Sequence, residues 1–96
     1  MAIISEKAKI KYSPMEQAIL EALQNAPERR LTTIDLVDEV YRERRRPIYP
    51  RETLISIIKS LQNKSDLNME DFEIQNTQAN GPYPISWFLE KRKVSV

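Results

Sequence analysis

The sequence predicts an α+β fold in which three amphipathic helices precede a two-stranded antiparallel β-hairpin. Apolar residues recur at three- and four-residue spacing in three segments: residues 13–25, 32–44 and 49–63. Two segments with strand-like alternation follow, 72–77 and 85–90, and the turn between them contains Gly81, the only glycine of the chain. A chain of 96 residues is long enough for one modest core, so we expect a single domain.

The first predicted helix has a clear start signal. Ser13 is a favoured N-cap residue, Pro14 fits the first helical position, and Glu16 stands where a capping box places its glutamate. The apolar stripe that follows consists of Met15, Ala18, Ile19, Ala22 and Leu23. Residues 1–12, which carry alternating lysines, are interpreted either as an exposed edge strand or as an N-terminal arm.

The second predicted helix begins in a similar way, with Thr32 as the cap and Asp35 in the place of the glutamate. Its apolar stripe consists of Ile34, Val37, Val40 and Tyr41, with Leu36 beside it. Four arginines within residues 42–46 place positive charge at the helix C-terminus, and Pro47 then stops the helix.

The third predicted helix begins at Pro50 and has a narrow apolar arc with a polar face opposite it. Its end is expected at residues 64–66. Because the apolar stripe of each element is too small to be stable alone, all stripes should pack together. The residues predicted to be buried are Leu23, Leu36, Val40, Leu54, Ile58, Leu61, Ile74, Trp87 and Leu89.

The composition argues against most enzyme chemistry. The chain has neither cysteine nor histidine, so it lacks thiolate nucleophiles and the commonest general acid–base and metal ligand. A single glycine excludes the glycine-rich phosphate loops of nucleotide-binding sites. The acidic residues Asp35, Asp38 and Glu39 are interpreted as a solvated helix face and not as a catalytic pair. We therefore expect no enzymatic activity, no cofactor and no metal site.

The N-terminal sequence contains no long apolar stretch and no small-residue cleavage site, which indicates that a secretory signal is absent. Apolar runs elsewhere are too short to span a bilayer. We expect a cytoplasmic protein that is full-length or nearly so and has no membrane partner.

Three segments resemble a known family. They are a threonine-capped helix start before a basic loop (31–37), a helix with serine and lysine between aliphatic residues (53–61), and a glycine–aromatic–aliphatic hairpin (81–90). Together they resemble the winged helix-turn-helix domain, and more narrowly the DNA-binding effector domains of two-component response regulators. The resemblance implies a three-helix bundle with a small antiparallel hairpin wing over residues 13–93. It also implies a short strand at Arg30 and Leu31 that pairs with the hairpin.

The resemblance makes sequence-specific binding of double-stranded DNA the leading hypothesis, with a role as a small transcriptional regulator. Residues 42–64 contain seven basic and two acidic side chains, although the net charge of the whole chain is only +1. This basic stretch covers the third helix and its approach, where a major-groove reader needs it. The predicted DNA-binding residues are Arg44, Arg45, Arg46, Arg51, Glu52, Ile55, Ser56, Lys59 and Asn63.

The alternative is a winged-helix module that binds a protein partner and no DNA. It is favoured by the near-neutral net charge, by the absence of charge at the predicted wing tip, and by the aromatic residues Tyr83 and Phe88, which are candidates for exposure. A third possibility combines both, with a homodimer that forms through the N-terminal arm or the wing and binds a palindromic site.

Overall fold

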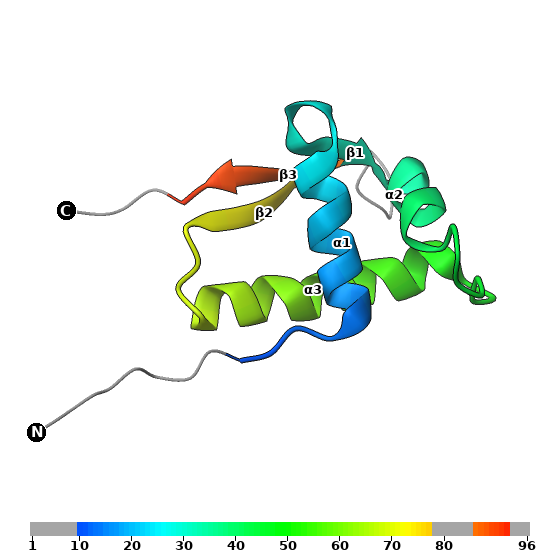
Figure 1. Cartoon of the computed structure of the whole chain (residues 1–96), viewed down its shortest axis with the longest axis horizontal. Coiled ribbons are helices and arrows are strands. Elements are labelled where there is room, and N and C mark those ends of the chain that lie inside the picture. The colour runs from blue at the N-terminus through cyan, green and yellow to red at the C-terminus, as the bar shows by residue number, and fades with distance from the viewer. Residues whose placement is uncertain (1–9, 78–85, 93–96) are drawn as a thin grey trace, which may run out of the picture.

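The computed structural model describes residues 10–77 and 86–92, and within them the fold is α+β, as predicted (Figure 1). The elements, in chain order, are α1 (Pro14–Asn25), a 3-10 turn (Pro27–Arg29), β1 (Arg30–Thr32), α2 (Thr33–Val40), α3 (Pro50–Leu67), β2 (Phe72–Thr77) and β3 (Ser86–Lys91). The predicted turn, with Gly81 and Tyr83, and Ile85, the first residue of the predicted second strand, lie outside the described residues.

The three strands form one antiparallel sheet in the order β1-β3-β2. The hairpin strands pair with Ile74 opposite Leu89, and β1 pairs on the other side of β3 with Leu31 opposite Trp87. The short strand expected at Arg30 and Leu31 is therefore present. Because β1 comes between α1 and α2 in the chain, this pairing ties the helices to the sheet.

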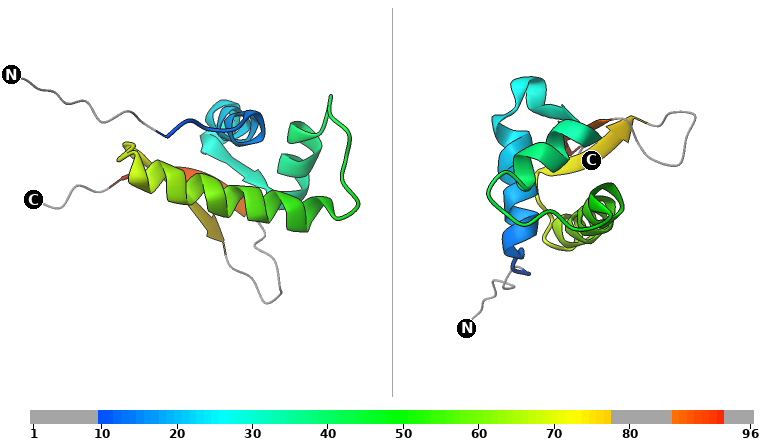
Figure 2. Two further views of the ribbon diagram at one scale, coloured as in Figure 1. Left: turned by 90° about the horizontal axis from the view of Figure 1, so that it is seen from below. Right: turned by 90° about the vertical axis from the view of Figure 1, so that its right-hand side faces the viewer.

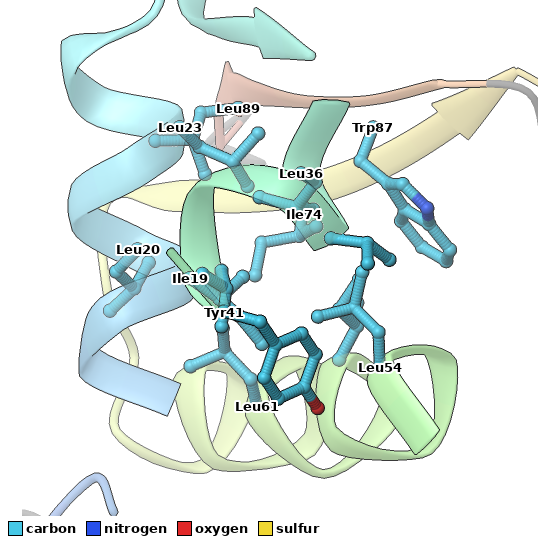
Figure 3. Packing of buried hydrophobic residues seen from close by; sticks show 13 residues of the cluster. Ile19, Leu20, Leu23, Leu36, Tyr41, Leu54, Leu61, Ile74, Trp87 and Leu89 are labelled. Carbon is cyan, nitrogen blue, oxygen red and sulfur yellow. The ribbon is translucent and has the colours of Figure 1, made fainter. Parts of the chain in front are cut away.

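One core lies between the three helices and the inner face of the sheet (Figure 3). All nine residues predicted to be buried are buried, and Ile19, Leu20, Val37 and Tyr41 join them. The indole of Trp87 packs in this core, and its Nε1–H donates to Oγ1 of Thr33 at 3.1 Å. This bond satisfies the one polar group that the indole brings into the apolar interior.

The second helix departs from the prediction in two respects. It ends at Val40, whereas the sequence pattern continued to residue 44; after Tyr41 the chain forms turns, and the guanidinium of Arg44 donates to the carbonyl of Val40 at 3.0 Å. Ile34 is 62% exposed, because the face that packs inward is set by Thr33, Leu36, Val37 and Val40. The inward-facing residues of α2 therefore begin at Thr33, one residue before Ile34, where the predicted apolar stripe began.

The third helix is longer than predicted and ends at Leu67. Its end is a Schellman motif, in which the N–H of Glu70 donates to the carbonyl of Ser65 and the N–H of Met69 to that of Asp66, both at 3.1 Å. Met69 occupies the left-handed position with φ of 55°. Glycine is usual at this position, and because methionine stands there instead, no glycine marks the true end of the helix in the sequence.

The described end of the predicted N-terminal arm, residues 10–12, is not a strand, and it is fastened to the C-terminal end of α3. The side-chain amide of Asn68 accepts from the N–H of Ile10 at 2.7 Å and donates to its carbonyl at 2.9 Å. The hydroxyl of Tyr12 donates to the carboxylate of Glu70 at 2.6 Å. These bonds hold the chain in place before α1 begins.

A buried carboxylate connects α1 to α3. Glu16 is 3% exposed and completes the capping box, with the N–H of Ser13 donating to Oε1 at 2.7 Å. Two side chains of α3 reach the same carboxylate: the hydroxyl of Ser60 donates to Oε2 at 2.9 Å, and Nζ of Lys64 to Oε1 at 2.7 Å. Burial alone would raise the pKa of Glu16, but the bonds from Lys64, Ser13 and Ser60 outweigh it and hold that pKa below its ordinary value.

We predict that Glu16→Gln lowers the free energy of unfolding by about 1–3 kcal/mol, because Lys64 and Ser60 lose a charged acceptor in a buried site. The lowered pKa of Glu16 means that its contribution is complete above its ordinary value of 4.5 and is lost as the pH falls through the folded-state pKa. Urea unfolding at several pH values measures both effects. Glu21→Gln, an exposed position on the same helix, is the control; an equal loss in both variants would contradict the role assigned to Glu16.

We also predict that Met69→Gly raises the free energy of unfolding by about 0.5–1 kcal/mol, because glycine adopts the left-handed conformation without the clash of a Cβ atom. The side chain of Met69 is 85% exposed, so little packing is lost. Thermal unfolding measures the change. Met69→Ala keeps the Cβ atom and should leave stability nearly unchanged, and a gain of the same size in the alanine variant would refute the explanation.

Candidate nucleic-acid interface

Four exposed polar side chains form a straight stripe along α3. Glu52, Ser56, Lys59 and Asn63 follow one another at intervals of four, three and four residues, which places them on one line of a helix surface. The buried residues of the helix, Leu54, Ile58, Leu61 and Ser65, lie on the opposite side. Seen from below, α3 crosses the face of the molecule turned to the viewer (Figure 2, left). All four residues of the stripe are exposed.

The polar residues of α3 beside this stripe are engaged within the protein. Ser60 and Lys64 bind Glu16, and Nε2 of Gln62 donates to the carbonyl of Ile74 at 2.8 Å. Further along, Asp66 forms an ion pair with Arg92 at 2.8 Å. These contacts identify the polar side chains that hold α3 in place.

Of the remaining residues predicted on α3, Arg51 and Glu52 are exposed in the first turn, whereas Ile55 is half-buried and packs against the core. Ile55 therefore has an internal role and presents only part of its surface. Arg51 lies in the first turn of α3, at the end of the helix that the basic loop enters, so the predicted residues of helix and loop are close together in the chain.

The loop arginines differ in how far they are engaged. Arg44 donates to the carbonyl of Val40, and Arg46 forms an ion pair with Asp38 at 2.9 Å. Arg42, next to them, pairs with Glu39. Arg45 is exposed. The acidic side chains of α2 thus neutralise part of the positive charge that the sequence places before α3.

The sheet's outer face shows an arrangement that the sequence pattern did not reveal. The guanidinium of Arg30 lies 4.3 Å from the centre of the Phe88 ring, and its Nη1 donates to Thr77 Oγ1 at 3.2 Å and to Ser86 Oγ at 3.3 Å. Phe88, expected as an exposed aromatic residue, is consequently half-buried. Only the pairing of β1 with β3 brings Arg30 to this ring, so no local signal predicts the contact.

A second surface feature is an open groove between α1 and the C-terminal end of α2. Its apolar lining comes mainly from small and aliphatic residues, including Ala18, Ala22 and Val40, and charged side chains such as Glu21 and Glu43 line it as well. The groove is the surface feature most relevant to the protein-interaction alternative.

In the part of the chain that the structure describes, no group of three or more acidic side chains is placed to hold a metal ion. None of the described helices is long and apolar enough to cross a membrane. Comparison with known proteins gives no relative: no protein-family model, curated protein or solved structure matches the chain.

Proposed function

We propose that this chain is a winged-helix protein that binds double-stranded DNA in a sequence-specific manner and acts as a small transcriptional regulator. The observation that carries the proposal is the exposed stripe of α3, in which Ser56, Lys59 and Asn63 face outward on a helix anchored from the other side. Small, cationic and amide side chains are those that reach base edges in the major groove.

The order of elements supports the same reading. Three helices are followed by the hairpin strands β2 and β3, and β1 closes the sheet beside β3. In helix-turn-helix proteins the second helix of the motif lies in the major groove, a role that falls here to α3. Its 18 residues give a rod of about 27 Å, long enough to follow the groove over several base pairs.

Charge sets the expected character of binding. The net charge of +1 and the ion pairs of Arg42 and Arg46 leave few cations for phosphates, so nonspecific affinity should be weak. Arg45 is exposed in the loop that precedes α3, and Arg51 is exposed in the first turn of α3, so both side chains can approach phosphates from the start of the helix. Most of the affinity for a specific DNA site is then expected to come from contacts with its bases.

The second candidate function is a protein-interaction module without DNA binding, and the groove between α1 and α2 favours it. This groove lies away from the stripe of α3, since it is lined by the outer side of α1 and the end of α2. A partner in the groove would respond to substitutions at Ala18 or Glu21, and DNA on α3 to substitutions at Ser56. Arg44 does not separate the two functions, because it lines the groove and also belongs to the arginine loop.

The deciding prediction concerns Ser56→Glu. This substitution adds a carboxylate to the middle of the exposed stripe, so stability should change by less than about 0.5 kcal/mol, while DNA affinity should fall at least about tenfold through repulsion by phosphates. Thermal unfolding and mobility shifts with pools of random duplexes at low and moderate salt measure both quantities. Gln24→Glu adds the same charge to the exposed side of α1 and should leave binding unchanged. Full binding by folded Ser56→Glu protein would refute the proposed interface.

A second prediction concerns the arginine loop. Replacing Arg44, Arg45 and Arg46 together by alanine should weaken binding to all sequences and reduce the slope of log affinity against log salt by about one unit per lost phosphate contact. The exposed pair of Arg46 with Asp38 contributes little stability, but Arg44 also loses its bond to the carbonyl of Val40, so the free energy of unfolding should fall by about 1–2 kcal/mol. A salt titration of the triple variant against Arg29→Gln, on the turn before β1, tests this. An unchanged slope would show that the loop is only solvated surface.

A further inference from the structure

Two side chains of the α3 stripe, Lys59 and Asn63, differ from their polar neighbours on the helix. Within residues 10–77 and 86–92, neither side chain makes a hydrogen bond or an ion pair. Ser60, Gln62 and Lys64, which lie between or beside them in the chain, all have internal partners. Lys59 and Asn63 therefore contribute no described polar contact to the fold.

The sequence around Lys59 leaves its charge uncompensated. Its helical neighbours at three and four residues are Ile55, Ser56, Gln62 and Asn63, none of which is acidic. The nearest acidic residues of the helix stand seven residues away on either side: Glu52, in the first turn on the same stripe, and Asp66, which is paired with Arg92. A fixed positive charge thus stands near the middle of the exposed face.

Asn63 is notable for a different reason. Asparagine is a poor helix former, and it is usually found at caps and turns where its amide bonds to the backbone. Here it stands four residues before the last residue of an 18-residue helix and points away from the core. Its amide presents a donor and an acceptor side by side, which is the pattern that matches the N6 and N7 edge of adenine.

On these grounds, and resting on the proposed function, we infer that α3 reads a guanine with Lys59 and an adenine with Asn63. In the major groove, a lysine ammonium donates to the O6 and N7 acceptors of guanine. An asparagine amide accepts from N6 of adenine and donates to its N7. Four residues of helix span about 6 Å, and base pairs are spaced by about 3.4 Å, so the two bases lie within about two base pairs of each other. Ser56, one turn earlier, is small enough to let the helix approach the groove floor.

The test is selection of bound duplexes from a random pool by the full chain, followed by affinity measurements on the enriched site and on single base-pair changes of it. The wild-type protein should enrich a guanine and an adenine within two base pairs. Lys59→Ala should lose preference at the guanine alone and Asn63→Ala at the adenine alone, each by roughly 5- to 150-fold on the enriched site. Lys59→Arg should keep the guanine, and Asn25→Ala, an exposed asparagine on α1, should change nothing.

The outcomes separate the two proposals. If the wild-type protein retains no duplex at any salt concentration, the proposed function is wrong and the base assignment falls with it. If duplexes are retained but Lys59→Ala weakens all sequences equally, Lys59 contacts phosphate and the guanine assignment is overturned. An enriched site whose adenine preference survives in Asn63→Ala overturns the assignment of Asn63 while leaving DNA binding in place.

Discussion

The arrangement of the domain depends on the buried carboxylate of Glu16. It fixes the start of α1 through Ser13 and holds α3 through Ser60 and Lys64, so the rotation of α3 about its own axis is set from two sides. Apolar packing on one side and this polar anchor on another leave only the remaining face exposed. The bonds from Ser60 and Lys64 to Glu16 therefore help to turn the face that carries Ser56, Lys59 and Asn63 outward.

A similar use of polar side chains protects the sheet edge next to α3. Gln62 donates to the carbonyl of Ile74, and Arg92 donates to that of Phe72 at 3.2 Å. Both carbonyls belong to β2, an edge strand whose free groups would otherwise invite pairing with another chain. These two bonds occupy carbonyl groups that an added strand would otherwise use.

The ion pairs around the loop between α2 and α3 reduce the positive charge that the proposed DNA-binding surface could offer to phosphates. Glu39 and Asp38 pair with Arg42 and Arg46, so part of the charge that would attract any duplex is compensated within the chain. A reader with few phosphate contacts depends more on base contacts, because phosphate contacts add affinity without sequence information. In the proposed winged helix, the low net charge is thus compatible with specific binding at modest total affinity.

The sequence by itself determined the helix starts and the nine central core residues, since caps, prolines and apolar spacing act between neighbours in the chain. The strand that pairs with the hairpin was expected only from the family resemblance, because its partner lies far away in the chain. It misplaced the ends of α2 and α3 and the exposure of Ile34, and it did not reveal the contact of Arg30 with Phe88. Tertiary structure decided these features. A partner 44 residues away, as Ser60 is from Glu16, leaves no mark in the local pattern, yet it decides which polar residues of a helix are engaged and which face outward.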